Sequence, residues 1–361
     1  MKIAIFGAGQ LAMMMIQAVH QKKHEFIVVD PSTRPPASHY TEHMQADYDD
    51  STIIKEIGEN FDIATIDFEN VSVKAMRELE KYIPVHPSSH ALDICQDRLK
   101  EKNLFRKLNI NTTEYYEIND LDDLKKNLNK NKHYILKSRR FGYDGKNQYR
   151  IKPDIEIKTD LIKQDCILEE LVDFEAEVSL ICVKATNGDV YYYPLVENHH
   201  KNGILSMSRY PSNYTFLQNK AQDIAEKLLE AMNYIGVLVI EFFVNSNKEL
   251  VANEMAPRVH NSGHWTIEGS SLSQFSAHID AISGSHDYKK SITFKPSVMF
   301  NILSKHITNE KAEALKSKFD ISLHDYHKAE RMNRKLGHLT FTCENKKELD
   351  INIKEIAEVI Q

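Results

Sequence analysis

The chain has 361 residues, of which 42% are hydrophobic and 27% are charged, and these proportions are typical of a globular protein of two or three domains. Its 46 basic and 52 acidic residues give a formal net charge of −6, so the sequence lacks the basic excess of a nucleic-acid-binding surface and favours a small-molecule substrate. No apolar run approaches the roughly 20 residues that cross a bilayer. Four widely separated cysteines without a CxxC pair indicate reduced thiols in the cytoplasm rather than zinc or disulfides.

The first hundred residues alternate strand and helix signals. A strand, a glycine turn, a helix and a second strand form a βαβ unit, and further short strands extend the layer to about residue 100. These elements are expected at Lys2 to Phe6, Gln10 to Gln21, Phe26 to Asp30, Ile63 to Phe68 and around Ile83 to Val85. We therefore predict a Rossmann-like domain over residues 1–100.

The turn from Gly7 to Gln10 resembles part of a dinucleotide-binding fingerprint, and Asp30 lies about where a ribose contact would be expected. The third glycine of that fingerprint is replaced by Ala12-Met13, and Gln10 would lie among the phosphates. The turn therefore favours some other phosphate over NAD. An NAD-dependent dehydrogenase remains an alternative.

Residues 101–290 are predicted to form a second domain, entered through an amphipathic helix from Asp97 to Leu108. A strand from Tyr134 to Lys137 ends at a loop with two glycines, Phe141 to Gln148, which we interpret as part of a mobile lid over about residues 115–185. Strands at Cys166 to Leu171, Glu177 to Val183 and Val190 to Pro194 follow, and then a helix from Lys220 to Met232.

Residues 291–361 are predicted to form a small C-terminal α+β domain. Its elements are a strand from Ser297 to Leu303, a helix near Glu310 to Phe319, a basic segment from Lys328 to Lys335 and a strand from Gly337 to Thr342. The whole chain is thus expected to be an α/β and α+β multidomain protein.

The strongest chemical signal is a carboxylate inside a buried strand. Glu241 interrupts the apolar run from Ile235 to Val244. Unpaired burial of an ionised carboxylate costs at least several kcal/mol, so Glu241 must be neutral, paired or bound to a cation.

The next strand, Leu250 to Met255, carries a second carboxylate, Glu254. If Asn245 pairs with Lys248 across a two-residue turn, Glu241 faces Ala252 and Glu254 lies diagonally on the same face. Two such carboxylates suit Mg²⁺ bound to nucleotide phosphates.

Asn253 would face away from this pair unless a bulge turned it inward. The competing interpretation is that both carboxylates form salt bridges with Arg258 or another basic residue. Paired histidines, His199-His200 and His260 with His264, also allow a zinc site, which we regard as the weaker hypothesis.

A second group of residues fits a nucleotide. Glycines in the segment Gly142-Tyr143-Asp144-Gly145-Lys146 let backbone amides approach phosphate oxygens, and Lys137 can meet their charge. The segment Glu169 to Val172 resembles a strand that runs into an adenine-reading linker. An ordinary hairpin turn with a surface lysine explains the first of these motifs equally well.

Together these motifs resemble the ATP-grasp superfamily and, more narrowly, the 5-(carboxyamino)imidazole ribonucleotide synthases of purine biosynthesis. The resemblance runs over nearly the whole chain, and its specific parts are Ala256-Pro257-Arg258-Val259-His260-Asn261-Ser262-Gly263-His264 and Arg334-Lys335-Leu336-Gly337-His338. Its other parts are GAGQL at the start, Thr65 to Val71, Asp97-Arg98 and the GYDGK loop. The chain departs from the usual family pattern at Ala12, Asp67 and Val259.

The resemblance implies an ATP- and magnesium-dependent ligase that joins bicarbonate to 5-aminoimidazole ribonucleotide through carboxyphosphate, as a cytoplasmic homodimer. It implies ATP contacts from Arg98, Lys137, Gly142, Tyr143, Asp144, Gly145, Lys146, Asn147, Gln148, Glu169, Glu170, Leu171, Val172, Glu177, His200, Asn253 and Glu254. Magnesium would be held by Glu241, Asn253 and Glu254, and the ribonucleotide by Gln10, Glu69, Tyr143, Asp144, Arg258, Lys328, Arg334 and Lys335. Catalytic roles would fall to Arg258, which orients bicarbonate, and to Tyr143, Asp144 and Lys335.

Four rival functions share part of this pattern. The formate-using phosphoribosylglycinamide transformylase and the biotin carboxylases have a similar N-terminal domain and ATP site, but the short RKLGH tail argues against both. An NAD-dependent dehydrogenase leaves Glu241 and Glu254 without a purpose. A nucleotide-binding regulator without turnover is disfavoured by the intact Lys137, Glu241, Glu254 and Arg258.

Overall fold

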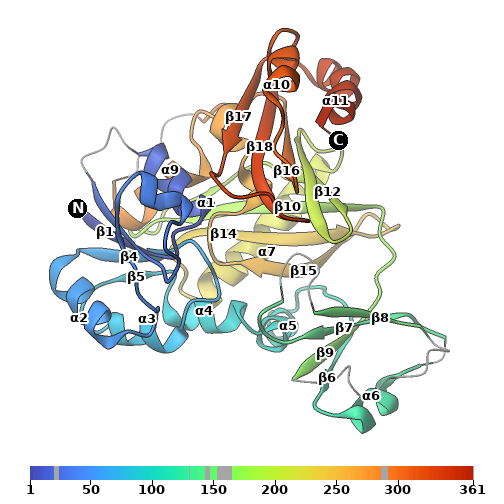
Figure 1. Cartoon of the computed structure of the whole chain (residues 1–361). Coiled ribbons are helices and arrows are strands. Elements are labelled where there is room, and N and C mark those ends of the chain that lie inside the picture. The colour runs from blue at the N-terminus through green and yellow to red at the C-terminus, as the bar shows by residue number, and fades with distance from the viewer. Residues whose placement is uncertain (20–23, 130, 143–146, 153–164, 286–291, 361) are drawn as a thin grey trace.

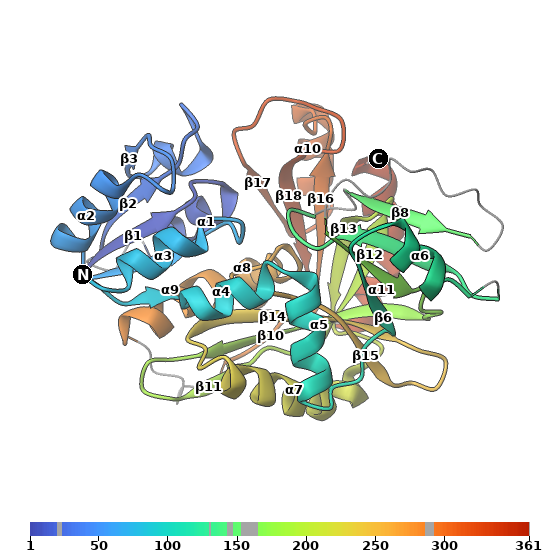
Figure 2. The same ribbon diagram turned by 90° about the horizontal axis from the view of Figure 1, so that it is seen from below.

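The computed structural model describes residues 1–19, 24–129, 131–142, 147–152, 165–285 and 292–360. Within these ranges the chain forms a parallel N-terminal sheet, a large central sheet and a small antiparallel sheet that projects from the body of the molecule (Figure 1, Figure 2). The mixed α/β and α+β architecture predicted from the sequence is confirmed. No helix in the described ranges is long and apolar enough to cross a membrane.

The N-terminal sheet has the strand order β3-β2-β1-β4-β5, and its pairs are parallel. Ile3 and Ile5 of β1 pack with α1, whereas Ala4 and Phe6 pack with α2 and α3, so both faces are buried and the strand needs no polar side. Its elements are β1 (Lys2–Phe6), α1 (Gln10–Ala18), β2 (Glu25–Val29), β3 (Glu42–Met44), α2 (Ser51–Asn60), β4 (Ile63–Ile66), α3 (Val73–Leu79), β5 (Val85–His86) and α4 (Ser89–Cys95).

The order of this sheet reverses between β1 and β4, as in other doubly wound sheets. Ligands of such sheets bind beside the carboxyl ends of the strands at the point of reversal. The segments that follow β1 and β4 therefore mark one edge of the candidate site.

The small sheet follows helix α5 (Arg98–Lys107) and has the order β6-β9-β7-β8. It has a core of its own, to which Leu124, Tyr134 and Leu168 contribute. Its elements are β6 (Tyr115–Ile118), α6 (Leu121–Asn127), β7 (Tyr134–Ser138), β8 (Gln148–Ile151) and β9 (Cys166–Glu170).

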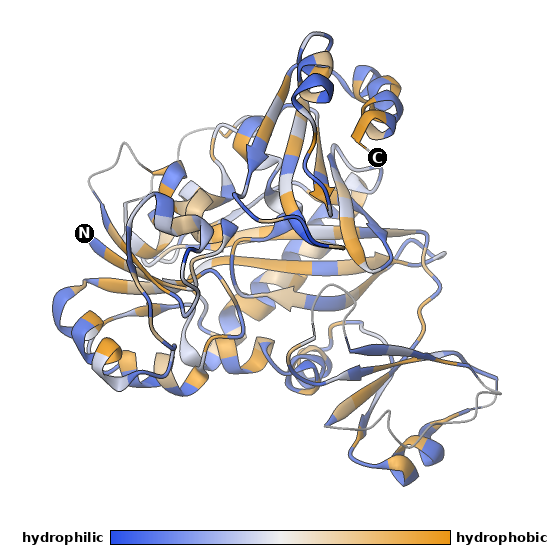
Figure 3. Cartoon of the chain, viewed as in Figure 1, coloured by the Kyte–Doolittle hydropathy of each residue, from blue (hydrophilic) through white to orange (hydrophobic). Residues whose placement is uncertain are grey.

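The central sheet is antiparallel, with the order β15-β14-β10-β12-β13-β16-β18-β17 and with β11 paired to β10. Strand β14 of this sheet is largely hydrophobic, whereas the C-terminal helices alternate polar and apolar residues (Figure 3). The strands are β10 (Ala176–Lys184), β11 (Val190–Tyr192), β12 (Val196–Lys201), β13 (Ile204–Tyr210), β14 (Gly236–Val244), β15 (Leu250–Ala256), β16 (Ser297–Leu303), β17 (Ile321–Asp325) and β18 (Lys335–Thr342). The helices are α7 (Gln218–Ala231), α8 (Thr266–Gly269), α9 (Gln274–Ser283), α10 (Asn309–Lys316) and α11 (Lys346–Ile360).

The C-terminal strands belong to the central sheet. β16 pairs with β13 from Met207 opposite Phe300 to Tyr210 opposite Ser297, and β18 pairs with β16. The segment that precedes β18 is thereby brought to the same space as the N-terminal crevice.

Candidate active site

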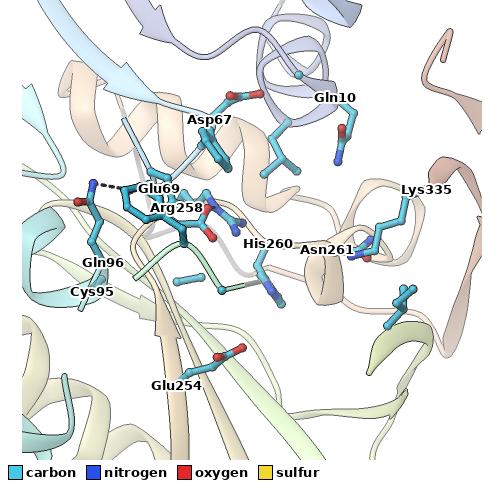
Figure 4. A pocket seen from close by; sticks show the side chains of 18 of the residues that line it. Gln10, Asp67, Glu69, Cys95, Gln96, Glu254, Arg258, His260, Asn261 and Lys335 are labelled. Carbon is cyan, nitrogen blue, oxygen red and sulfur yellow. Dashed lines mark hydrogen bonds and ion pairs between the residues drawn. The ribbon is translucent and has the colours of Figure 1, made fainter. Parts of the chain in front are cut away.

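A cavity of about 910 Å³ lies between the N-terminal sheet, the β14–β15 hairpin and the segment before β18. Figure 4 shows Gln10, Glu69, Glu254 and Lys335 around one space, although they come from distant parts of the chain. The predicted site residues that line the cavity are Gln10, Glu69, Arg98, Gly142, Glu241, Glu254, Arg258, Lys328, Arg334 and Lys335.

The turn between β14 and β15 differs from the prediction. Asn245 pairs with Glu249, because the amide of Asn245 donates to the carbonyl of Glu249 at 3.1 Å. Lys248 has a φ of 59° and closes a three-residue loop, the common alternative to a two-residue hairpin turn. The amide of Lys248 does donate to the carbonyl of Asn245 at 2.9 Å, but the expected two-residue turn and the register that follows from it were wrong.

The same hairpin contains a bulge that places the two carboxylates directly opposite each other. Phe242 pairs with Ala252, but the next ladder pair is Glu241 with Glu254. Asn253 is the extra residue of this bulge. The bulge that was needed to turn Asn253 toward the site is therefore present. The predicted diagonal placement of Glu254, with Glu241 opposite Ala252, was wrong, and the true pairing brings the two carboxylates closer.

The surroundings of the two carboxylates differ. Burial raises the pKa of Glu241, and the charge of Glu254 raises it further. Burial also acts on Glu254, but its ion pair with Arg98, 2.8 Å between NH1 and Oε2, lowers the pKa of that carboxyl overall. The salt-bridge interpretation is therefore correct for Glu254, with Arg98 as the partner instead of Arg258.

Glu241 faces a neutral partner. Nε2 of His260 lies 3.5 Å from its Oε1, and burial together with the charge of Arg258 lowers the pKa of this histidine to about 3. His260 is uncharged and a second carboxylate lies opposite, whereas His200 and Lys335 oppose the rise in the pKa of Glu241. The pair thus fits a divalent ion that takes its remaining ligands from phosphate and water.

No group of three or more His, Cys, Asp or Glu side chains in the described part of the chain could hold a metal by itself. The described residues thus do not include the three or four protein ligands that zinc sites have.

Cations line the opposite side of the cavity. Burial and the neighbouring charge of Arg334 lower the pKa of Lys328 to about 8, and its ammonium donates to Oε1 of Gln10. Lys335 begins β18, and Arg334 immediately precedes it. Clustered cations of this kind suit an anionic group such as a phosphate.

Glu69 and Arg258 form an ion pair in the middle of the cavity. The Nε atom of Arg258 donates to Oε2 of Glu69, and NH1 donates to the carbonyl of Val259 at 3.0 Å. Burial acts against the charge of Glu69, but Arg258 outweighs it and lowers the pKa of that carboxyl. Arg258 is thereby held in a fixed orientation.

A second polar group lies outside this cavity, on β7 and β9. Oε2 of Glu169 is 3.0 Å from the ammonium of Lys137 and 3.6 Å from that of Lys102. All three side chains are less than one-tenth exposed. Burial is outweighed by these lysines, which lower the pKa of Glu169 to about 2.

A third polar pair lies on β10 and β12. His200 Nδ1 is 2.6 Å from Oε2 of Glu177. Burial acts against the charged imidazole, but Glu177 and Glu241 raise the pKa of His200 overall. His200 is therefore a potential cation beside the nucleotide region predicted from the sequence.

Comparison with known proteins identifies the family. Residues 1–96 match the ribonucleotide synthetase preATP-grasp domain, residues 103–275 the ATP-grasp domain and residues 297–352 the phosphoribosylaminoimidazole carboxylase C-terminal domain. An N5-carboxyaminoimidazole ribonucleotide synthase of Pseudomonas aeruginosa is 36% identical over 100% of both chains. The chain belongs to the N5-carboxyaminoimidazole ribonucleotide synthase family.

Solved structures agree with this assignment. The N5-carboxyaminoimidazole ribonucleotide synthetase of Thermus thermophilus has a TM-score of 0.90 and 35% identity, over 99% of this chain and 98% of that one. The Aspergillus clavatus synthase, solved with ADP and 5-aminoimidazole ribonucleotide, has a TM-score of 0.87 and 27% identity, over 99% and 98% of the two chains. The predicted family, its ATP-grasp fold and its class as an ATP-dependent ligase are confirmed.

The cavity does not include every residue that the family resemblance assigned. The predicted residues outside its lining are Lys137, Asn147, Gln148, Glu169, Glu170, Leu171, Val172, Glu177, His200 and Asn253. Tyr143, Asp144, Gly145 and Lys146 lie outside the described residues. Arg98 connects the two regions, because it pairs with Glu254 and NH2 donates to the carbonyl of Gly142 at 3.2 Å.

Sequence reasoning did not place Lys102 or Arg139 in this synthase site. Lys102 is 1% exposed and donates to the carbonyl of Asn253 at 2.8 Å, so it supports the bulge. Arg139 binds both oxygens of Asp97, at 3.1 and 2.8 Å. Asp97 also caps α5. A helix cap can be predicted from the sequence, but the ion pair of Asp97 with Arg139 cannot.

The glycine turn after β1 is occupied by carboxylates. The amide of Ala8 donates to Asp30 at 3.1 Å, and that of Ala12 donates to Asp67 at 3.3 Å. A side chain at Gly7 would lie 1.9 Å from Oδ1 of Asp67. These amides are therefore engaged within the protein, which disfavours a bound dinucleotide pyrophosphate.

Proposed function

We propose that this protein carboxylates the exocyclic amine of 5-aminoimidazole ribonucleotide with bicarbonate, using ATP, and releases ADP and phosphate. The main support for this proposal is the cavity. It brings together two carboxylates that face each other, an arginine with a fixed orientation and a cluster of cations. The Aspergillus clavatus relative, solved with both ADP and the ribonucleotide, supports both ligands.

The nucleotide is assigned to the region between the small sheet and the hairpin. Lys137, Glu177 and His200 are assigned to its contacts, together with Arg98 and Gly142, which line the cavity. Buried cations at Lys137 and Arg98 would stabilise charge that develops on the transferred phosphoryl group.

Magnesium is assigned to Glu241, Glu254 and Asn253. When bound, the ion neutralises phosphate charge and orients the phosphoryl group for transfer. Glu254 keeps its position through Arg98, and the backbone of the bulge is held by Lys102.

Bicarbonate is assigned to Arg258. Attack of a bicarbonate oxygen on the γ-phosphate gives carboxyphosphate and ADP, and attack of the substrate amine on the carboxyl carbon then expels phosphate. Arg258 would orient the anion, and its ion pair with Glu69 sets the direction of its guanidinium.

The ribonucleotide phosphate is assigned to Lys328, Arg334 and Lys335, with Gln10 fixed by Lys328. Glu69, Tyr143 and Asp144 are assigned to the remainder of this substrate. We further propose domain boundaries near residues 100 and 290, a lid over about residues 115–185, a cytoplasmic location and a homodimer.

The test is ADP release from purified protein with Mg²⁺, ATP and bicarbonate, measured with and without 5-aminoimidazole ribonucleotide. We expect strong stimulation by the ribonucleotide and a carboxylated product. Stimulation by formate and glycinamide ribonucleotide instead would support the transformylase alternative, and no stimulation by any ribonucleotide would refute the assignment.

A further inference from the structure

Three consecutive residues, Gln96, Asp97 and Arg98, contact three different parts of the molecule. Gln96 binds the loop after β4, Asp97 binds Arg139 of the small sheet, and Arg98 binds Glu254 of the hairpin. The backbone contributes as well, because the amide of Arg98 donates to the carbonyl of Arg139 at 3.0 Å. This segment therefore joins the nucleotide region to the ribonucleotide region.

The side-chain amide of Gln96 is the part of this connection that reaches Glu69. Its Nε2 donates to the carbonyl of Glu69 at 2.7 Å (Figure 4) and also to the carbonyl of Val71, at 2.6 Å. Both N–H groups of the amide are thus used on a single loop. The loop carries the carboxylate that fixes Arg258.

The other end of the same amide faces the small sheet. NH2 of Arg140 lies 3.4 Å from Oε1 of Gln96 and 3.4 Å from Oδ1 of Asp93. Arg140 is two residues before Gly142, whose carbonyl accepts from Arg98. A displacement of the small sheet would therefore change the distance between the guanidinium of Arg140 and the side-chain amide of Gln96, which holds the Glu69 loop.

We infer that Gln96 is a positioning residue that couples the nucleotide-binding sheet to the ribonucleotide site. It fixes the Glu69 loop with its amide nitrogen, and it responds to the sheet through the contact of its amide oxygen with Arg140. This inference depends on the proposed function, since it assigns Gln96 to the same two substrates.

The test combines Gln96→Met, Arg140→Met and the double variant. Gln96→Met keeps the length of the side chain but removes its three polar contacts. We expect it to raise the KM for the ribonucleotide about tenfold while the KM for ATP changes less than about twofold. Gln96→Glu, which keeps an acceptor for Arg140 but presents no donor to the loop, should lose ribonucleotide affinity similarly and serves as the second variant.

The coupling itself is measured as the ratio of ribonucleotide affinities with and without ADP and Mg²⁺. We expect the wild-type ratio to fall toward one in either single variant, and the double variant to show no further loss. Additive losses in the double variant would overturn the coupling, and an unchanged ribonucleotide KM in both Gln96 variants would overturn the positioning role.

Gln218→Met is a matched control for a purely structural effect. The amide of Gln218 also makes two main-chain contacts, 2.7 Å from the amide of Leu195 and 3.1 Å to the carbonyl of Tyr193, but it lies outside the cavity. This variant should lower stability without raising the KM for the ribonucleotide relative to the KM for ATP. A selective rise in the ribonucleotide KM in Gln218→Met would overturn the inference. Wild-type protein that shows no ribonucleotide-stimulated ADP release would refute the proposed function and the inference with it, whereas normal stimulation with unaffected Gln96 variants would refute the inference alone.

Discussion

Glu241 and Glu254 face each other across β14 and β15 because Asn253 adds one residue to β15. A regular ladder with the same turn would place Asn253 opposite Glu241 and would send the side chain of Glu254 to the other face of the sheet. The bulge is therefore a condition for the paired carboxylates. The carbonyl of Asn253 accepts a hydrogen bond from the buried Lys102, so the irregular backbone has a dedicated partner.

Glu254→Gln tests the proposed magnesium site. We expect turnover to fall at least about 100-fold, since a carboxylate is lost where phosphate charge must be neutralised, and we expect the Mg²⁺ concentration for half-maximal rate to rise. Steady-state ADP release over a magnesium titration measures both. Glu249→Gln, an exposed carboxylate on the same hairpin, is the control and should behave as wild type; an unaltered magnesium dependence in Glu254→Gln would exclude this site.

Lys335→Ala tests the assignment of the substrate phosphate. Loss of one cation at this end of the cavity should raise the ribonucleotide KM about tenfold or more and leave the KM for ATP nearly unchanged. Lys347→Ala removes an exposed lysine of α11 and should change neither constant. An unchanged ribonucleotide KM in Lys335→Ala would show that the phosphate binds elsewhere.

Glu169→Gln tests the buried ion group of β7 and β9. It leaves Lys102 and Lys137 without their shared carboxylate, and breaking a buried pair in this way costs about 3–5 kcal/mol of unfolding free energy. Urea denaturation measures the loss. The neighbouring Glu170→Gln removes a more exposed pair with Lys132 and should cost much less unfolding free energy; equal losses in the two variants would contradict the special role of Glu169.

Asp67→Asn tests a pH dependence of stability. Burial raises the pKa of Asp67 to about 6, against 3.8 for the unperturbed group, so between these pH values the folded state binds the proton more tightly than the unfolded state does. Stability due to this group therefore falls as pH rises, by up to about 3 kcal/mol over two pH units.

The asparagine variant lacks this titration. Its melting temperature relative to wild type should accordingly rise between pH 4 and pH 7, as measured by thermal denaturation over that range. A difference that stays constant with pH would show that the pKa of Asp67 is unshifted in the folded protein, and a difference that shrinks as pH rises would show that it is lowered; either result would contradict the raised pKa.

Local patterns in the sequence predicted much of this structure. The strand from Lys2 to Phe6 is found with those bounds, and α1 begins at Gln10 as expected. The β14–β15 hairpin also appears where a charged residue interrupted an apolar run. These predictions succeeded because hydrophobic periodicity and turn residues act over a few neighbouring positions.

Other features depend on contacts between residues that are distant in the sequence, which hydrophobic periodicity cannot predict. The bulge at Asn253 is supported by Lys102, 151 residues away in the chain. Helix α6 was not predicted in its polar segment, although Asp120 caps it with a 2.8 Å hydrogen bond to the amide of Asp123 and Leu124 is fully buried. One buried leucine is too weak a signal until the sheet that covers it is known.

The candidate site shows the same division. The residue types at Glu241, Glu254, Arg258 and Lys335 could be read from motifs, and the cavity brings these four together. The hydrogen-bond partners within the site could not be predicted, because they are distant in the sequence. Arg98 and Glu254 are 156 residues apart, and Gln96 and Glu69 are 27 residues apart. Electrostatic roles are set by such pairings, so they required the fold.

The hydrogen bonds between β13 and β16 have a consequence for protein engineering. A fragment that ended before residue 297 would lack β16 and would leave β13 as an edge strand of the sheet. The unpaired main-chain donors and acceptors of an exposed edge strand promote self-association. Although strands β16 to β18 lie beyond the proposed boundary near residue 290, they complete the central sheet through the pairing of β16 with β13. Chimaeras should keep β13 through β18 from a single parent.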